Sequence, residues 1–191
     1  MTGYPPRRLQ TAQHGEDRES LFTPELRTRT PRPPDRARQT TMNHLMPTTK
    51  NVLFLCTGNY YRSRYAEELF NHLASAEGLA WRAFSRGAAE KGSPDDVGPM
   101  SRFAHDALDA KGIAPEGATR DPRPCSLADF EKAQLVIALK EAEHRPLIER
   151  RFREVASRVT YWHVDDIEFA HPSIALAMID DHVCELISTL K

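Results

Sequence analysis

The segment CTGNYYRS, at residues 56–63, combines residue types that can bind an anion and attack it. Cys56 supplies a thiol, and the thiolate form of a thiol is a strong nucleophile. Arg62 supplies a planar guanidinium that can hold two oxygens of a phosphoryl group at once, which the ammonium of lysine cannot do. Ser63 can donate a hydroxyl hydrogen bond to the sulfur. We therefore expect nucleophilic chemistry on an oxyanion at this segment.

The backbone between these side chains is expected to hold the anion. In a turn that joins a strand to a helix, N–H groups can point inward, and the helix N-terminus adds partial positive charge. Gly58 allows a backbone conformation that other residues resist, and Asn59 can fix the turn through its side-chain amide. The predicted phosphate-binding residues are Thr57, Gly58, Asn59, Tyr60, Tyr61, Arg62 and Ser63. A cysteine at a strand end is more often a small core residue, but these neighbours favour the catalytic interpretation of Cys56.

The elements that must position this turn alternate between strands and helices from residue 49 onward. Short apolar runs predict strands, and apolar residues repeating every three or four positions predict helices. The predicted strands are 51–55, 81–85, 135–139 and 159–164, and the predicted helices are 63–77, 98–112, a short one after Ser126, 141–152 and 173–190. This order predicts an α/β fold, with a four-stranded parallel sheet and helices on both faces in a single domain. Sites in such sheets lie at the carboxyl ends of the strands, which is where Cys56 stands.

The first 48 residues differ in composition from the rest of the chain. They contain seven of the 14 prolines and eight arginines, against five acidic residues, and they lack apolar periodicity. Such a segment cannot bury enough apolar surface to offset its conformational entropy. We therefore predict a disordered Arg/Pro-rich tail at residues 1–48 and a folded domain at residues 49–191.

Composition and charge restrict the partners of the chain. A formal net charge of −1 gives no reason to expect nucleic acid or a membrane surface as a partner, and no apolar run is long enough to span a membrane. The three cysteines, Cys56, Cys125 and Cys184, are too few for a disulfide framework and favour a reducing compartment, so we predict a cytoplasmic protein. The histidines show no metal-ligand spacing with the cysteines, so no metal is predicted.

The stretch VLFLCTGNYYRSRYAEELF resembles the active-site region of the low-molecular-weight protein tyrosine phosphatases. That family typically has Cys-x-Gly-Asn-x-Cys-Arg-Ser-Pro-x-Ala-Glu after an apolar strand, and the matching residues here are Cys56, Gly58, Asn59, Arg62, Ser63, Ala66 and Glu67. The similarity runs from about residue 50 to 190. It implies hydrolysis of a phosphomonoester through a cysteinyl-phosphate intermediate, without a cofactor. The implied substrates are a phosphorylated protein, with phosphotyrosine expected, or a small aryl phosphate.

The chain departs from the family pattern at three places. Tyr61 stands where the family has a second cysteine, and Arg64 stands where it has a proline. The family's general acid usually stands in an Asp-Pro pair, but the pair Asp121-Pro122 comes too early in the chain and is expected to form a loop turn. In the family, the second cysteine can form a protective disulfide with the nucleophile, so the resemblance implies that Cys56 lacks this route to reversible oxidation.

The general acid is better sought in YWHVDDIEFAHPS, residues 161–173, which follow the last predicted strand. A general acid must reach the leaving oxygen and carry a proton. Asp166 aligns with the family's acid and is our choice, and Asp165 is the alternative. Trp162 and Phe169 are candidates to line the pocket, although aromatic residues near a sheet are more often part of the core.

The tyrosines of the turn have separate expectations. By the resemblance, Tyr60 occupies a variable position near the phosphorylated group, where its ring can select the substrate by shape or stack on an aryl leaving group. Tyr61 is equally compatible with simply filling space around the turn.

Three other functions remain open at the sequence level. An arsenate reductase of the same fold needs two further cysteines close together, but Cys125 and Cys184 lie 59 residues apart, which argues against it. A phosphoarginine phosphatase is compatible with the turn, because a few residues decide the substrate. The third is an anion-binding module without turnover, which would keep the turn and lose the acid.

Overall fold

The sheet contains four parallel strands, in agreement with the sequence prediction. The computed structural model describes residues 48–191, so the predicted tail lies outside the described residues except for its last position. The strands are β1 (Lys50–Cys56), β2 (Trp81–Gly87), β3 (Leu135–Ala138) and β4 (Val159–Tyr161). Their spatial order is β2-β1-β3-β4, and all neighbouring pairs are parallel. Parallel pairing requires crossover connections, which the helices supply.

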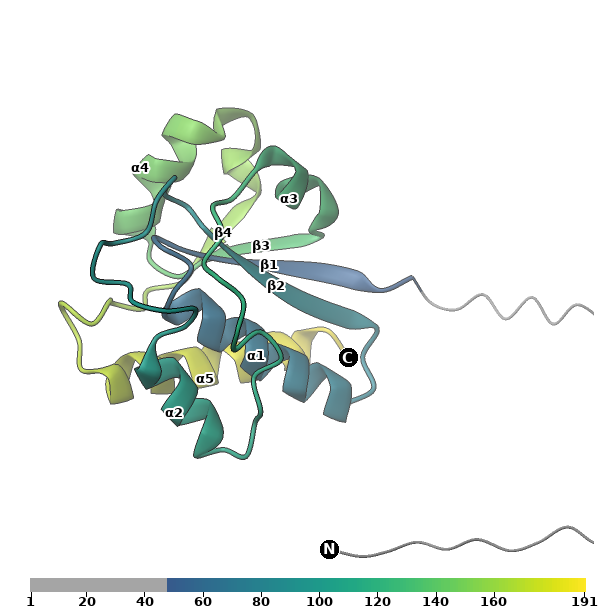
Figure 1. Ribbon diagram of the computed structural model, residues 1–191. Coiled ribbons are helices and arrows are strands. Elements are labelled where there is room, and N and C mark those ends of the chain that lie inside the picture. The colour runs from purple at the N-terminus through teal and green to yellow at the C-terminus, as the bar shows by residue number, and fades with distance from the viewer. Residues whose placement is uncertain (1–47) are drawn as a thin grey trace, which may run out of the picture. The chain divides into compact units, whose positions relative to one another are not determined.

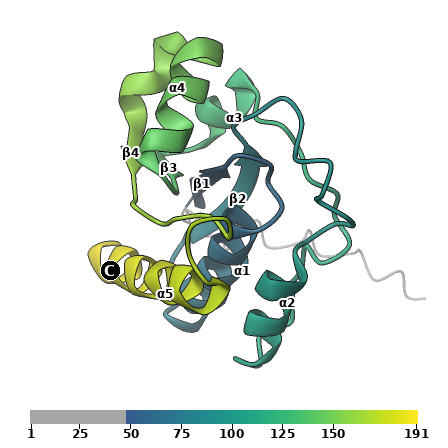
Figure 2. The same cartoon turned by 90° about the vertical axis from the view of Figure 1, so that its left-hand side faces the viewer.

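Helices cover both faces of this sheet (Figure 1). They are α1 (Arg62–Ala76), α2 (Arg102–Asp109), α3 (Leu127–Lys132), α4 (Glu141–Arg151) and α5 (Pro172–Thr189), with a 3₁₀ turn at Arg153–Arg158. Helices α1, α2 and α5 lie on one face, and α3 and α4 lie on the other, as the rotated view also shows (Figure 2). The prediction of helices on both faces is therefore confirmed.

The central strand β1 explains why two separate cores form. Side chains alternate between the two faces of a strand. Val52 and Phe54 therefore pack into the core beneath α1, α2 and α5, while Leu53 and Leu55 pack into the core beneath α3 and α4. All four are fully buried. This two-sided burial is the physical reason that β1 is a continuous apolar run and not an alternating one.

The helix ends follow the local sequence signals closely, with one exception. Gly78 and Gly112 adopt left-handed backbone conformations just beyond α1 and α2, as helix-terminating glycines do. Ser126 and Asp129 form a reciprocal capping box at the start of α3. The exception is α2, which begins at Arg102 and not at the predicted Gly98, because Gly98 has a φ of 89° and so cannot open an α-helix.

The strand β4 is shorter than predicted. It ends at Tyr161, and the chain then leaves the sheet edge, where His163 forms an isolated antiparallel bridge with Lys140. The segment that follows is irregular until α5 begins. Within residues 48–191, no helix has the length and apolar character that crossing a membrane requires.

Candidate active site

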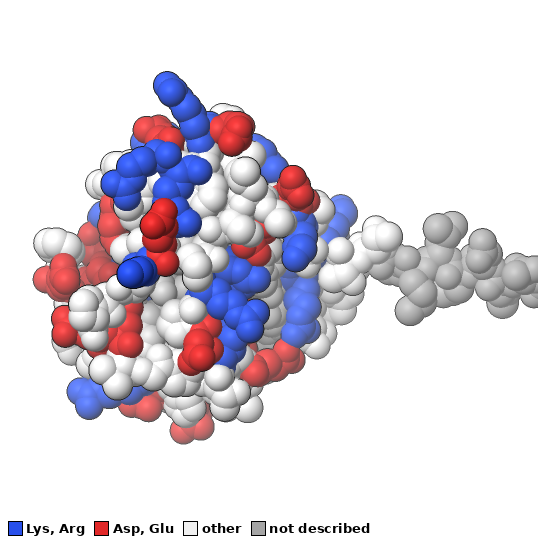
Figure 3. Space-filling view, turned by 45° about the horizontal axis from the view of Figure 1, so that its top comes forward, with Lys and Arg blue, Asp and Glu red and all other residues white. Residues whose placement is uncertain are grey.

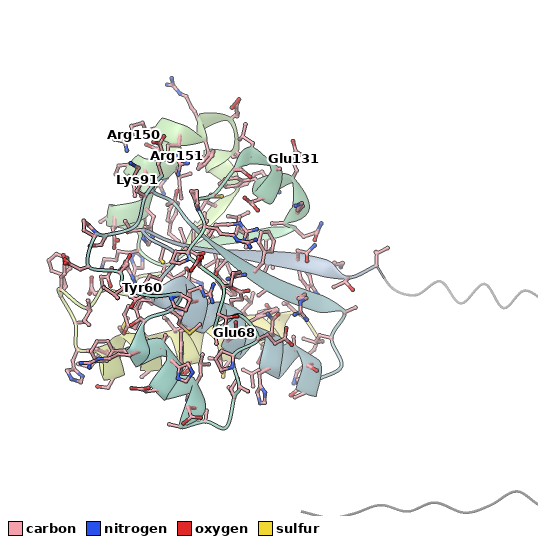
Figure 4. The ribbon with its side chains drawn as sticks, viewed as in Figure 1. Tyr60, Glu68, Lys91, Glu131, Arg150 and Arg151 are labelled. Atoms are coloured by element: carbon pink, nitrogen blue, oxygen red, sulfur yellow. The ribbon has the colours of Figure 1, made fainter. Side chains whose placement is uncertain are left out.

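A pocket opens at the carboxyl end of β1, where the turn into α1 lies. Its lining comes from four segments of the chain: Cys56, Thr57, Gly58, Tyr60, Tyr61 and Arg62 in the turn, Ser93, Asp95, Asp96, Ser101, Arg102 and Phe103 around the loop before α2, Glu143 in α4, and Asp166, Ile167, Glu168 and Phe169 after β4. Tyr60, which is labelled in Figure 4, lies at this end of the sheet. The predicted nucleophile, arginine and acid therefore share one pocket.

The thiol of Cys56 stands at the end of a buried hydrogen-bonded chain. Its Sγ lies 3.0 Å from the hydroxyl of Ser63. Asn59 donates to Ser63 Oγ at 3.2 Å and to Ser85 Oγ at 2.8 Å. Ser85 in turn donates to the carboxylate of Glu67 at 2.5 Å. The serine beside the sulfur therefore has a fixed orientation.

The glycine of the turn is needed for space. Asn59, and not Gly58, has the left-handed backbone, with a φ of 59°, so our expectation for Gly58 was wrong. A Cβ at position 58 would lie 2.7 Å from Asp96 Oδ2 and 3.2 Å from Gly92 Cα. The neighbouring loop therefore packs directly on the turn. Asn59 tolerates its conformation because both ends of its amide are held, the oxygen by the N–H of Arg123 at 3.0 Å.

The guanidinium of Arg62 is buried and surrounded by acceptors. Nη1 donates to Glu143 Oε2 at 2.9 Å and to the carbonyl oxygen of Val164 at 3.1 Å. Nη2 donates to Glu143 Oε1 at 2.8 Å and to Asp166 Oδ2 at 2.5 Å. Burial opposes the charged form, but hydrogen bonding to Glu143 and the nearby negative charges outweigh it and raise the pKa of Arg62. Arg62 thus stays cationic beneath the pocket.

The two neighbouring aspartates occupy different environments. Asp166 lines the pocket and pairs with Arg62. Asp165 is 41% exposed and pairs with Lys140 Nζ at 2.5 Å, and it is not part of the pocket lining. The geometry therefore favours Asp166 over Asp165 as the acid.

Comparison with known proteins agrees with this arrangement. Residues 51–186 match the family described as low molecular weight phosphotyrosine protein phosphatase, which is more than half of the chain. The chain belongs to this family. It is a cysteine-dependent phosphatase and therefore a hydrolase.

Individual relatives show the same likeness. The chain is 33% identical over 109 residues, 57% of its length and 67% of the relative's, to a protein-arginine-phosphatase of Bacillus subtilis. A low molecular weight protein tyrosine phosphatase from T. tengcongensis is 26% identical, with a TM-score of 0.59 over 74% of this chain and 97% of that one. The fold also matches that of YfkJ from Bacillus subtilis, at 23% identity and a TM-score of 0.65 over 75% of this chain and 96% of that one.

Glu143 is the residue of this phosphatase site that our sequence analysis missed. It lies in the first turn of α4, directly after the carboxyl end of β3. Burial opposes its charge, but hydrogen bonds from His144 and Arg62 outweigh burial and hold the pKa of Glu143 well below its ordinary value. The position of an acidic residue after a strand end was the available signal. Nothing in the sequence pairs that residue with an arginine 81 positions earlier.

The aromatic residues of the phosphatase divide between pocket and core. Tyr60 lines the pocket, and its hydroxyl donates to the carbonyl oxygen of Val97 at 2.7 Å. Tyr61 also touches the pocket but is 7% exposed and belongs to the core, and burial raises its pKa to about 12. Phe169 lines the pocket and is 79% exposed. Trp162 belongs to the core, where its ring stacks on His182, and does not line the pocket. Of the two interpretations that the sequence allowed for Trp162, the core one is therefore correct.

Arg64, which replaces the family's proline, braces α1 against a loop. Its side chain is fully buried and donates to the carbonyl oxygen of Gly117. Glu68, one turn later and labelled in Figure 4, accepts the N–H groups of Glu116 and Gly117, each at 2.9 Å. Burial, followed by repulsion from Arg120, lowers the pKa of Arg64. The substitution therefore fastens residues 116–117 to α1.

Two cysteines lie away from the phosphatase chemistry. Cys125 is buried, and burial raises its pKa to about 12, so its thiol is protonated and unreactive at neutral pH. Cys184 is exposed on α5. Neither lines the pocket, which argues against the disulfide relay of an arsenate reductase. No group of metal-ligating side chains occurs within residues 48–191.

Proposed function

We propose that the protein hydrolyses a phosphorylated side chain of a protein substrate, with Cys56 as nucleophile, Arg62 as anchor of the phosphoryl group and Asp166 as general acid. One observation carries this proposal: residues 56, 62 and 166 meet in one pocket, with Asp166 Oδ2 2.5 Å from Arg62 Nη2. The fold brings these residues together, because the acid lies 104 residues beyond the arginine in the sequence.

The reaction needs two displacements at phosphorus. The backbone N–H groups of residues 57–62 and the guanidinium of Arg62 hold the phosphoryl oxygens. The Cys56 thiolate attacks phosphorus, an S–P bond forms, and the bond from phosphorus to the leaving atom breaks while Asp166 gives that atom a proton. Water then attacks the cysteinyl-phosphate, with Asp166 accepting its proton. This step regenerates the thiolate and releases inorganic phosphate.

Phosphotyrosine is the substrate that the apolar part of the pocket favours. Tyr60, Phe103 and Phe169 contribute aromatic rings to the lining. Such rings can stack on an aryl leaving group in offset or edge-to-face geometry.

Phosphoarginine is a second candidate, favoured by the charge of the pocket. Five carboxylates and two guanidinium groups line it. Of the carboxylates, Asp95, Asp96 and Glu168 form no ion pair with another described residue. Figure 3 shows acidic side chains gathered on the left of the molecule, the side on which this pocket opens. A substrate that carries a cationic guanidinium beside its phosphoryl group suits such a lining, and the Bacillus subtilis relative is named a protein-arginine-phosphatase.

Matched peptides distinguish the two substrates. We would measure kcat/KM for two peptides of one sequence, bearing phosphotyrosine or phosphoarginine at the same position, and for p-nitrophenyl phosphate as an aryl phosphate without a peptide. Cys56→Ser should abolish turnover of every substrate and still bind inorganic phosphate, because the backbone cradle and Arg62 remain. Unchanged turnover in this variant would remove Cys56 from the mechanism. Phosphate binding without turnover in the unmodified chain would favour the anion-binding module.

The proposal also concerns the cellular location of the protein and the bounds of its catalytic domain. The cysteine nucleophile must stay reduced, and the three cysteines are free, which supports a cytoplasmic location. We also assign catalysis to the domain at residues 49–191. A chain that begins at residue 49 should therefore hydrolyse p-nitrophenyl phosphate with the kcat/KM of the full chain.

A further inference from the structure

The guanidinium of Arg62 offers two different edges to its neighbours. A guanidinium carries five N–H donors, four on Nη1 and Nη2 and one on Nε. The end that Nη1 and Nη2 form is occupied by the Glu143 carboxylate, at 2.9 and 2.8 Å. The side that Nε and Nη2 form is only half occupied. Nη2 contacts Asp166 there, and the buried Nε has no hydrogen-bond partner among the described residues.

Glu143 is itself held on the side away from Arg62. The hydroxyl of Thr57, a residue of the turn, donates to Glu143 Oε1. His144 Nε2 lies 3.3 Å from the same oxygen. The other ring nitrogen, Nδ1, accepts the backbone N–H of Lys140 at 2.9 Å, so the neutral ring carries its proton on Nε2, facing Glu143. His144 is fully buried, and burial lowers its pKa.

Asp166 is held less firmly than Glu143. Besides Arg62, the only hydrogen-bond partner of its carboxylate among the described residues is the N–H of Ile167, at 2.8 Å to Oδ1. The exposed fractions of the two side chains are nearly equal, at 30% for Asp166 and 31% for Glu143, so the difference lies in their partners. Two carboxylates therefore share one guanidinium, but only Glu143 is anchored by side chains from two other positions.

We propose that Glu143 is a positioning residue, which holds the end of the Arg62 guanidinium so that the edge formed by Nε and Nη2 faces the phosphoryl site. This assignment rests on the phosphatase function proposed above. An unpaired buried donor such as Nε raises the free energy of the ligand-free protein, and a phosphoryl oxygen would pair it. A second phosphoryl oxygen takes the Nη2 hydrogen that Asp166 accepts in the absence of substrate.

This exchange gives the two carboxylates separate tasks. Asp166 leaves Arg62 when the phosphoryl group arrives and becomes free to face the leaving atom. Glu143 remains in place throughout and keeps the guanidinium from rotating while its side edge changes partners. Arg62 can then follow the phosphoryl oxygens into the transition state without reorganising, which is how preorganised donors accelerate such reactions.

The test compares two matched substitutions on α4. Glu143→Gln keeps the shape of the side chain but presents N–H₂ to one of the Arg62 donors. Glu141→Gln is the control, because Glu141 makes the same change of charge two residues earlier and pairs with exposed Arg145 instead. We expect Glu143→Gln to lower kcat roughly 10²-fold, as a misplaced catalytic group does. The Kd for inorganic phosphate should change far less, because the backbone N–H groups still bind it. Glu141→Gln should leave both unchanged.

A double-mutant cycle separates positioning from a structural effect. In an Arg62→Ala background, Glu143→Gln should cause no further loss of activity, because the group that it positions is gone. Thr57→Val, which removes the hydroxyl that contacts Glu143 and His144, should also lower kcat, but by a smaller factor. Thr57→Val also keeps the test open if Glu143→Gln does not fold.

Each result that would contradict the positioning role of Glu143 can be told apart from the others. An equal loss in the Arg62→Ala background would make Glu143 structural. A rise in kcat/KM together with tighter phosphate binding in Glu143→Gln would mean that Glu143 competes with substrate for the guanidinium. If the unmodified protein bound phosphate but hydrolysed nothing, the proposed function would fail. Phosphate binding would still test the positioning role in that case, because tighter binding of phosphate by Glu143→Gln than by the unmodified protein would contradict it.

Discussion

Arg62 shows how much of this site depends on the geometry of a single side chain. Its guanidinium has contacts to Glu143 and Asp166, which stand 81 and 104 residues later in the chain. A planar group with donors on two edges can serve all of these partners at once, and a flexible ammonium cannot. Its buried position also strengthens each contact, because few water molecules compete.

We expect Arg62→Lys to be severely impaired although it keeps the positive charge. Lysine would offer three donors around one nitrogen and could not bridge Glu143 and two phosphoryl oxygens together. Steady-state kinetics with p-nitrophenyl phosphate measures the effect. An activity within about threefold of the unmodified enzyme corresponds to a loss below ~1 kcal/mol in transition-state stabilisation. Such a result would show that the planar pair of donors in the guanidinium is not needed.

We expect Asp166→Asn to slow the first chemical step most for poor leaving groups. Such groups need a proton as the bond to phosphorus breaks, whereas p-nitrophenolate leaves readily without one. With a demanding substrate the loss should be on the order of 10² to 10⁴. A series of aryl phosphates with rising leaving-group pKa measures the dependence.

Asp165→Asn is the control for this series, because Asp165 pairs with Lys140 and does not line the pocket. It should show little dependence on the leaving group. If Asp165→Asn carried the dependence, the two roles would be exchanged. If neither variant did, the general acid would not lie at residues 165–166.

Among the elements, the end of β2 supports the turn that follows β1. The N–H groups of Ala88 and Ala89 donate to the carbonyl oxygens of Cys56 and Thr57, at 2.7 and 3.1 Å. Gly87, the last residue of β2, lies so close that a Cβ there would stand 2.9 Å from the Thr57 oxygen and 3.2 Å from the Gly58 carbonyl carbon. The turn therefore takes its shape partly from its neighbour in the sheet.

We expect Gly87→Ala to displace the turn and lower both activity and stability. The new methyl group would meet backbone atoms, which cannot move aside as a side chain can, and such overpacking costs roughly 1–3 kcal/mol. Urea unfolding and kcat measure the two effects. Gly92→Ala is the control, because the closest atom there is Asp96 Oδ2, at 2.9 Å on a movable side chain. Equal effects in the two variants would contradict backbone crowding as the cause.

At the scale of the whole molecule, the ionisable groups in and near the site make the free energy of unfolding depend on pH. Hydrogen bonds from His144 and Arg62 lower the pKa of Glu143 from its ordinary value of 4.5, so below about this pH the unfolded chain binds a proton that the folded chain does not. Stability from this group is therefore complete above that pH and is lost as the pH falls. Burial raises the pKa of Glu68 and of Asp96, and these groups act in the opposite direction.

We therefore expect a difference measurement to isolate Glu143. The free energy of unfolding of the unmodified protein, minus that of Glu143→Gln, should be constant between about pH 5 and 7 and should shrink as the pH falls below 4.5, the ordinary pKa of a glutamate. Denaturant titrations at a series of pH values provide both curves. A difference that does not vary with pH would show that Glu143 gains nothing from its ionised form in the folded state.

The strand, the turn and the helix at residues 50–76 were readable from the sequence because their contacts are local. Apolar runs, a glycine and a helical repeat act within a few residues of one another, and alternation of strands and helices then restricts the sheet to parallel pairing. Cys56, Arg62 and Ser63 lie within that one segment, so their proximity could be predicted.

The tertiary structure decided what the sequence had left as alternatives: Asp166, and not Asp165, lies in the pocket beside Arg62, and Trp162 lies in the core. It also placed Glu143 against Arg62 and showed that Gly58 is needed for space. Each of these depends on how segments far apart in sequence pack together. Adjacent residues such as Asp165 and Asp166 have the same local signals, and the difference between them arises from Lys140 and Arg62, which reach them across the fold. Local backbone preferences carry no information about such partners.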